Sequence, residues 1–296
     1  MKRMILIVLI TFVGMPLSFA DGPFGTAGLV SSGTSIPPFQ DFWVYLYPRE
    51  GRPSRGDLKD ESELQTRLTG SLAKFLANTP YAGVRVKVFN GIPDAEETVR
   101  LEGASIIECD PYVFARARRR HAPDGFGYHI LLQRETDEPL VAEFRVSAES
   151  PIQKVEDLQD KWIGIIHESS GCGQRALESL GRRNFRAGLD YNEVRTGYLT
   201  NSFLCLQAGI VDAIVVPRDL ARTLSDPPVA TRVIETTPSY LAPLFAARVT
   251  DLEKYPELIY AARNEIQDYY GPDEVVLSSD DLYATIETAP TEGPAP

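Results

Sequence analysis

Short apolar blocks of strand length alternate along the chain with segments whose apolar residues recur at helical spacing. Residues 42–47 and 84–89 alternate as strands do, and in residues 61–77 a leucine recurs at every fourth position, as on one face of a helix. The same patterns predict further strands at residues 104–109, 128–133, 141–146, 162–167, 193–197, 213–217, 232–237 and 244–249, and further helices at 94–101, from 110 onward, at 172–180, 201–208 and 252–270. This order is typical of sheets covered by helices.

The strand and helix series runs twice, which predicts two α/β lobes, each a mostly parallel sheet flanked by helices, with a ligand cleft between them. We expect lobe one to comprise residues 42–145 plus 240–283, and lobe two residues 146–239. The chain would cross between the lobes near residues 144–148 and 234–238. Residues 21–41 are rich in Gly, Ser and Pro and read as a loose leader, and residues 284–296 lack the apolar content of a core and are predicted to be disordered.

The first 20 residues have the pattern of a secretory signal peptide. Lys2 and Arg3 precede an apolar stretch at residues 5–13, and a small-x-small site ends at Ala20. The stretch is too short to span a bilayer, so we expect cleavage after Ala20 and a periplasmic protein. No cysteine stands at the expected cut, so a lipid anchor is not indicated.

The charge balance narrows the classes of partner. The chain carries 41 acidic and 30 basic residues, a formal net charge of −11. Such a surface repels nucleic acids and anionic lipid headgroups. From this charge we expect no nucleic-acid partner. Since no further apolar run of membrane length follows the signal peptide, we expect no direct membrane insertion. We also expect a monomer.

The junction at residues 161–177 is the strongest candidate for chemistry. An apolar run that ends at His167 meets a small polar turn, Ser169-Ser170-Gly171, and a helical pattern begins at Cys172. A strand-to-helix turn of this kind points backbone N–H groups and the positive end of a helix dipole into a crevice, which suits a small ligand. The same residues are also ordinary helix N-caps, so both roles are open.

Other polar residues follow predicted strands and would face the same crevice. Tyr47, Asp110 and Tyr112 stand at strand ends of lobe one, where they serve either as ligand contacts or as loop caps. Asn201 and Ser202 open a helix and have the same two readings. A further residue, Arg218, has the geometry for a bidentate carboxylate contact, although a surface pair with Asp219 is the favoured outcome.

Three cysteines, Cys109, Cys172 and Cys205, allow one bridge in an exported protein. At a helix N-terminus the thiol pKa of Cys172 is expected to fall, which favours a reactive or metal-binding thiolate. A bridge between Cys172 and Cys205 is the leading structural alternative. A metal site fits poorly because His167, His121 and His129 are scattered, so no metal and no cofactor is predicted.

The order of these elements resembles the type II periplasmic substrate-binding proteins of ABC transporters, within them the branch that binds phosphonate, phosphite and related oxyanions. Residues 104–114 look like the family strand that ends in Gly-Pro-x-x-Tyr, and 150–164 like its Asp-Leu-x-x-Lys segment. Residues 206–215 resemble its Leu-x-x-Gly-x-Val-Asp-Ala element, and 252–270 its terminal helix. The match covers roughly residues 42–270.

Most anchors that the resemblance implies for a phosphonate are changed in this chain. Where the family has three neighbouring hydroxyls, this sequence has Ser170, Gly171 and Cys172, and the Tyr that closes the Gly-Pro-x-x-Tyr motif is Phe114. The expected His near residues 199–202 is absent, and Glu168 adds a negative charge. Only Asp219 and Tyr47 remain, which disfavours a dianionic phosphonate.

The resemblance implies a binding protein, not an enzyme, that captures a small polar or anionic solute between its lobes and docks on an inner-membrane ABC permease. An alternative is an accessory factor of the same fold that docks on, or delivers a cofactor or metal to, a periplasmic redox enzyme. A thiol- or metal-dependent enzyme is a third, weaker reading. The predicted ligand-binding residues are Tyr47, Asp110, Pro111, Tyr112, His167, Ser169, Ser170, Gly171, Cys172, Asn201, Ser202 and Asp219.

Overall fold

The computed structural model describes residues 40–48, 55–121, 127–134, 136, 138–224, 227–271 and 275–277. The predicted signal peptide with its cleavage after Ala20, most of the leader and the tail at 284–296 lie outside these residues. Among the described residues, no helix combines the length and the apolar character that crossing a bilayer requires.

Among the residues that the structure describes, the first sheet has six strands in the order β11-β4-β10-β3-β1-β2. Its strands are β1 (Gln40–Leu46), β2 (Tyr81–Val88), β3 (Ile106–Cys109), β4 (Tyr128–Arg134), β10 (Leu244–Arg248) and β11 (Val275–Leu277). Its helices are α1 (Arg55–Leu76), α2 (Ile92–Arg100), α3 (Pro111–His121), α7 (Val249–Lys254) and α8 (Pro256–Tyr270). We call these elements the first lobe.

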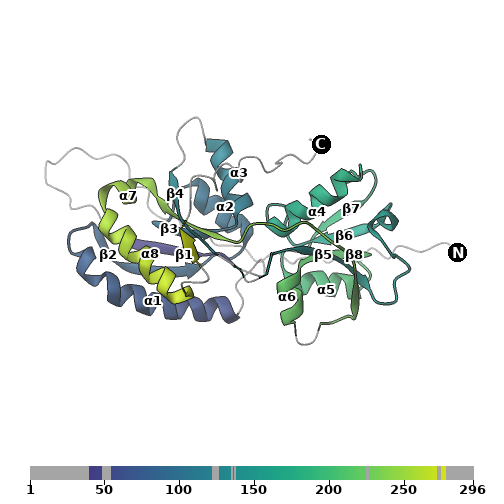
Figure 1. Ribbon diagram of the computed structural model, residues 1–296, viewed down its shortest axis with the longest axis horizontal. Coiled ribbons are helices and arrows are strands. Elements are labelled where there is room, and N and C mark those ends of the chain that lie inside the picture. Colours follow the sequence, from purple (N-terminus) through teal and green to yellow (C-terminus); the bar gives the residue numbers. More distant parts are fainter. Residues whose placement is uncertain are drawn as a thin grey trace, which may run out of the picture. The chain divides into compact units, whose positions relative to one another are not determined.

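Two cores cover the faces of this sheet. On one face α1 and α8 lie side by side (Figure 1), and the buried leucines Leu64, Leu68 and Leu72 of α1 pack against the strands, as their spacing predicted. On the other face α2 and α3 bury apolar residues such as Val99 and Val113. Alternate residues of β1 therefore enter different cores, as the period of a strand requires.

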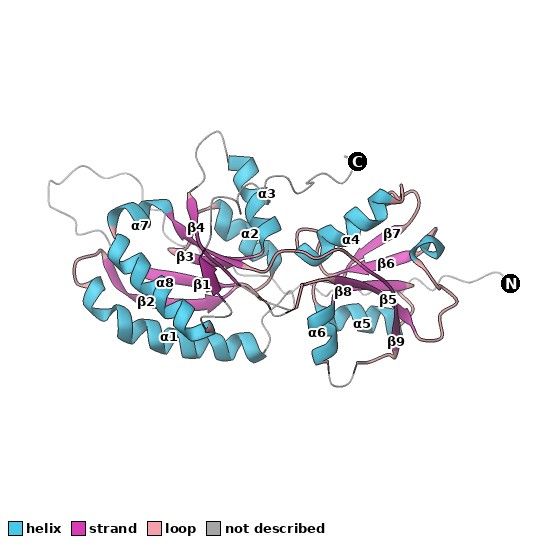
Figure 2. Cartoon of the chain, in the orientation of Figure 1, coloured by secondary structure: helices cyan, strands magenta, loops and turns pink. Residues whose placement is uncertain are grey.

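Within the described part of the chain, the second sheet has five strands in the order β7-β6-β8-β5-β9. Its strands are β5 (Ala142–Ser147), β6 (Trp162–Ile165), β7 (Asn192–Arg195), β8 (Ala213–Pro217) and β9 (Thr231–Thr236). Its helices are α4 (Gly171–Arg182), α5 (Leu199–Gln207), α6 (Arg218–Thr223) and a short 3₁₀ turn, Val155–Leu158. We call these elements the second lobe. Figure 2 shows α4 on one side of this sheet and α5 with α6 on the other.

Both sheets are mixed, and most strands of each run in one direction, in agreement with the predicted mostly parallel sheets. The βα repeats pair in parallel, as β1 does with β2 and β6 with β8. The strands that run the other way are β10 and β11 in the first sheet and β5 in the second, and they pair antiparallel with their neighbours. Local periodicity identifies a strand but carries no information about its direction, so the mixture was not visible in the sequence.

Several element bounds also differ from the sequence predictions. Helix α1 begins at Arg55, inside a segment predicted to be a loop, and α6 and β11 were not predicted. The long terminal helix is two helices, since Pro256 lacks an N–H and starts α8 as its first residue. The predicted boundary between residues 145 and 146 cuts β5, which lies wholly in the second sheet.

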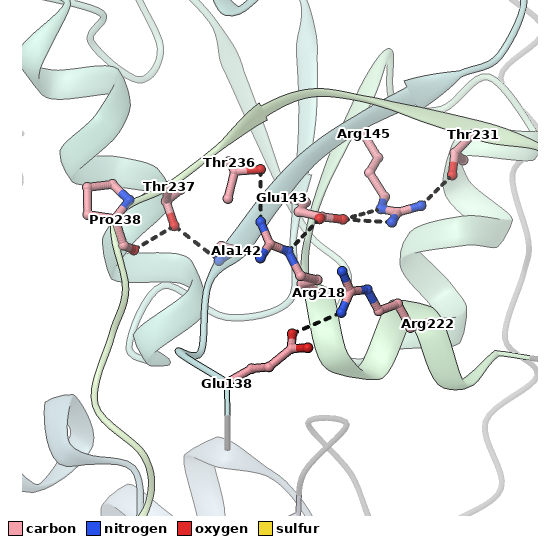
Figure 3. Close-up of polar contacts among 10 residues, drawn as sticks. All are labelled: Glu138, Ala142, Glu143, Arg145, Arg218, Arg222, Thr231, Thr236, Thr237 and Pro238. Carbon is pink, nitrogen blue, oxygen red and sulfur yellow. Dashed lines mark hydrogen bonds and ion pairs between the residues drawn. The ribbon is translucent and has the colours of Figure 1, made fainter. Parts of the chain in front are cut away.

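Two chain segments connect the lobes, before β5 and after β9. They run beside one another, because Leu140 and Tyr240 form an antiparallel bridge with a 2.8 Å bond from the Tyr240 N–H to the Leu140 carbonyl. Next to it, the Ala142 N–H donates to the Thr237 hydroxyl at 3.0 Å (Figure 3). The crossings thus form a short two-stranded connection that leads directly to the site.

Candidate functional site

A cavity of about 170 Å³ lies where the strand ends of both lobes meet the crossing segments. For scale, a cavity of roughly 150 Å³ in another protein holds a benzene molecule. The walls come from the first lobe, the second lobe and the crossings: Tyr47, Pro48, Ile92, Asp110, Arg134, Thr136, Leu140, Ile166, Ser170, Cys172, Pro217, Asp219, Leu220, Tyr240, Leu241 and Pro243. Five of the predicted site residues are among them: Tyr47, Asp110, Ser170, Cys172 and Asp219.

The turn before α4 forms as the sequence predicted. Ser170 is the N-cap, in an extended conformation, and its hydroxyl accepts the Gly173 N–H at 3.1 Å. Glycine is needed at position 173 because a Cβ there would stand 2.0 Å from the His167 carbonyl oxygen. That oxygen also accepts the Ser170 hydroxyl at 2.8 Å. The His167 carbonyl thus fixes how the chain enters the helix.

The first backbone N–H of helix α4 already has a hydrogen-bond acceptor within the chain. This donor, the N–H of Gly171, bonds Asp110 Oδ2 at 2.8 Å, and this carboxylate comes from the first lobe. The other oxygen, Oδ1, accepts the Tyr112 N–H at 2.8 Å at the start of α3. A single carboxylate therefore lies at the positive ends of two helices, one in each lobe. It occupies the place where the sequence predicted a ligand.

Burial changes the proton affinity of this group. Desolvation raises the pKa of Asp110 to about 6, and the hydrogen bonds from the Gly171, Tyr112 and Val113 amides oppose the rise. Above that pH the carboxylate is charged and holds both helix ends. The side chain is 6% exposed, so the solute cavity touches it while bulk water hardly does.

A second contact between the lobes lies beside the first. Arg116 of α3 donates to the Ser169 hydroxyl at 2.7 Å, and Ser169 is buried. The predicted residue Ser169 therefore holds the other lobe rather than lining the cavity. Its N–H donates to Nδ1 of His167 at 3.1 Å, and burial lowers the pKa of this imidazole. His167, like Ser169, lies outside the cavity wall.

The remaining predicted residues serve other contacts. The ring of Tyr112 faces the guanidinium of Arg175 at 5.8 Å, and Pro111 is the first residue of α3. Asn201 and Ser202 are helix-end residues: the Asn201 amide donates to the Thr196 carbonyl at 3.0 Å, and the Ser202 hydroxyl lies 2.6 Å from that of Thr196. Neither of the two lines the cavity.

The cysteine predictions are wrong in two respects. All three cysteines are free, because Cys172 packs in the core under α4 whereas Cys205 packs with α5 on the opposite face of the sheet. The pKa of Cys172 is raised, not lowered, since burial outweighs the helix dipole and the carboxylates of Asp219 and Asp110 add to the rise. Within the described ranges no group of His, Cys, Asp and Glu is placed to bind a metal ion.

Arg218 does not pair with Asp219, which corrects the favoured expectation. Its guanidinium bonds the buried carboxylate of Glu143 at 2.9 Å and reaches the Thr236 hydroxyl at 3.4 Å (Figure 3). Arg145 binds the other oxygen of Glu143 at 2.6 Å. Arg218 and Arg145 thus share the carboxylate of Glu143 under the crossing, and neither guanidinium pairs with Asp219.

The cavity also contains residues that sequence reasoning missed. Arg134 is held by Glu108 at 3.2 Å, and Tyr240 covers the turn so closely that a Cβ on Gly171 would stand 2.6 Å from its ring. Tyr240 follows directly on the predicted second crossing, which is the one signal that could have marked it. Arg134 has no such signal, because its role depends on a partner in another strand.

Comparison with known proteins places the chain in a family. A family model described as the periplasmic substrate-binding protein of a phosphonate ABC transporter matches residues 59–269. The chain belongs to this family. It is therefore one of the periplasmic substrate-binding proteins of ABC transporters, which are binding proteins and not catalysts. No curated protein matches the chain.

Solved structures show the same fold at low sequence identity. PhnD1 from Prochlorococcus marinus, in complex with methylphosphonate, has a TM-score of 0.63 at 15% identity, covering 84% of this chain and 96% of that one. A binding-protein component of a phosphonate ABC transporter from Pseudomonas aeruginosa has a TM-score of 0.60 at 13% identity, with 83% and 84% covered. The alkanesulfonate-binding protein SsuA from Xanthomonas axonopodis pv. citri, bound to MOPS, has 0.55 at 12%, with 80% and 74% covered. The predicted type II two-lobed fold is confirmed.

Proposed function

We propose that this protein captures a small polar solute in the cavity between its lobes and delivers it to an inner-membrane ABC permease. The observation that carries the proposal is the cavity itself, whose wall is built from strand ends of both lobes and from the crossing segments. A solute that touches both lobes favours the state in which they are together, and a permease can then recognise that state.

The buried hydroxyl of Tyr47 supports the presence of a ligand. The side chain is 7% exposed and lines the cavity, yet among the described residues its oxygen has no hydrogen-bond partner. A buried polar group without a partner costs about 1–3 kcal/mol, so such groups mark positions where a ligand or an ordered water completes the site. Family membership gives the same reading of the cavity.

The weaker reading of a thiol- or metal-dependent enzyme loses the support of a low thiol pKa at Cys172, because burial raises this pKa. The alternative of an accessory factor rested on the altered crevice and the cysteines, and it would show as a failure to bind any small solute together with co-purification of a partner. The proposal of a solute-binding protein needs no thiolate.

Native mass spectrometry of the protein isolated from periplasm without dialysis tests the proposal. We expect the wild-type chain to carry a small molecule, and Leu220→Trp to lose it, because an indole at this wall position fills much of the cavity. Leu189→Trp is the matched control, since Leu189 is 67% exposed and lies outside the wall. The same bound mass in wild type and Leu220→Trp, or no bound mass in the wild type, would contradict the proposal.

A further inference from the structure

Part of the cavity wall belongs to the segments that connect the lobes. Leu140 lies between β4 and β5, and Tyr240, Leu241 and Pro243 lie between β9 and β10. A hinge motion about the crossings moves the backbone of these residues relative to both lobes, which sets them apart from the rest of the wall. Tyr240 is the aromatic residue of this group, and its ring lies against the turn before α4.

The ring of Tyr240 packs directly on a glycine. A Cβ on Gly171, the first residue of α4, would stand 2.6 Å from Cδ2, 3.1 Å from Cγ and 3.3 Å from Cε2 of this ring. The favourable separation of two unbonded carbon atoms is about 3.5–4.0 Å. The ring therefore occupies the space that a side chain at position 171 would need, and its present position requires glycine there.

The backbone at Tyr240 is held from two sides. The Tyr240 N–H donates to the Leu140 carbonyl at 2.8 Å, which joins the two crossings. The carbonyl of the preceding residue, Ser239, accepts Nε of Arg175 at 3.0 Å, which joins the second crossing to α4. A ring that is pushed away from Gly171 would therefore have to rotate about its side-chain bonds, and the open space beside it is the cavity that it lines.

The ring also lies within electrostatic reach of polar wall residues from both lobes. Burial raises the pKa of Tyr240 above its ordinary value, and Cys172, Asp219 and Asp110 raise it further. The pKa of Tyr47 is raised by burial and by Asp110, and Tyr240 contributes to that rise too. Tyr240 thus extends from the crossing into the part of the cavity where the two lobes face each other.

We propose that Tyr240 is a specificity-determining residue of the cavity, whose ring, packed on Gly171, limits the size of the solute that the closed lobes accept. This rests on the proposed function and adds to it the residue that sets the size of the solute. A solute too large for the space beside the ring would press the ring toward Gly171, where close packing leaves no room, and the lobes could not close around it.

Native mass spectrometry of variants isolated from periplasm without dialysis tests the size limit. Tyr240→Ala removes the ring, and we expect it to retain solutes heavier than that of the wild type, beside the wild-type solute at lower occupancy. Tyr240→Phe keeps the ring and loses only the hydroxyl, so it should not retain the heavier solutes. The inference is overturned if Tyr240→Ala retains no heavier mass, or if Tyr240→Phe retains the same heavier masses.

A methyl group on the other side of the contact gives an independent test. Gly171→Ala drives the ring into the cavity, so we expect this variant to lose the bound mass, and the double variant Gly171→Ala/Tyr240→Ala to regain one. Gly181→Ala is the matched control in the same helix, because nothing lies within 4 Å of its added methyl group, and it should retain the wild-type solute. A bound mass in Gly171→Ala equal to that of the wild type, or no regain in the double variant, would contradict a role of the ring.

The wild-type chain separates failure of the inference from failure of the proposed function. A wild-type chain that retains no mass contradicts the proposed function, and the inference falls with it. A wild-type chain that retains a solute, while Tyr240→Ala retains no heavier one, keeps its function as a solute carrier and loses only the size limit at Tyr240.

Discussion

Two strand-to-helix junctions meet at the cavity, β3–α3 in the first lobe and β6–α4 in the second, and they satisfy their first amides differently. At α3 the cap is local, since Asp110 precedes the helix and accepts the Tyr112 N–H. At α4 the local cap, Ser170, accepts from Gly173, and the Gly171 N–H relies on Asp110 of the other lobe. The second junction is complete only when the lobes are together.

The difference between the two junctions concerns which helix N-terminus is available to a ligand. A helix N-terminus with an unfilled first amide is a ready anion site, whereas the same N-terminus filled by a carboxylate of the chain is not. In this protein the Asp110 carboxylate also links the lobes, so the contact between the lobes and the occupation of this helix position depend on one side chain. Besides this carboxylate, the cavity wall carries Asp219, Arg134, Thr136, Ser170, two tyrosines and apolar residues.

The largest effect is expected from the turn itself. Gly173→Ala places a methyl group 2.0 Å from the His167 carbonyl, a backbone atom that cannot rotate away, so α4 must shift. We expect a loss of about 3 kcal/mol in the free energy of unfolding, measured by chemical denaturation. The matched control is Gly181→Ala in the same helix, where nothing lies within 4 Å, and where about 0.5–1 kcal/mol of stabilisation is expected. Equal effects of the two substitutions would show that the close approach at position 173 is relaxed in solution.

An effect of similar size should appear in the pH dependence of stability. The folded-state pKa of Asp110 is raised from 3.8 to about 6, so its protonated form is favoured in the native state. Its stabilising contribution is therefore complete below pH 3.8 and is lost as the pH rises through 6, a change on the order of 3 kcal/mol. The difference in unfolding free energy between wild type and Asp110→Ser, followed across this range, measures it. A difference that stays constant with pH would mean that Asp110 titrates as an exposed carboxyl does.

The sequence predicted both junctions because each is encoded locally. The apolar run before Ser170 and the Asp-Pro pair before α3 are start signals that depend on neighbouring residues, and the structure places both helices within a few residues of the predicted positions. The parallel βα units followed from the same local periodicity.

The contacts that decide the chemistry of the site are not local. Asp110 and Gly171 are 61 positions apart, and Glu143 and Arg218 are 75 apart. No spacing rule joins such residues, so the sequence placed Arg218 beside its neighbour Asp219 and left the α4 amide open for a ligand. Burial is likewise not a local property of the sequence. The pKa of Cys172 follows from the core that surrounds it, and not from its position at the start of a helix.

The central claim is that the Asp110 carboxylate occupies the anion position at α4. Calorimetric titration with methylphosphonate tests it most directly in three proteins: wild type, Asp110→Ser and Asp219→Asn. Serine retains a cap for α3 but is too short to fill the position at Gly171, so we predict that Asp110→Ser binds methylphosphonate and the wild type does not. Asp219→Asn removes the same charge without freeing the amide and should remain inert. Binding by the wild type as tight as that of Asp110→Ser, or no binding by Asp110→Ser, would contradict the account.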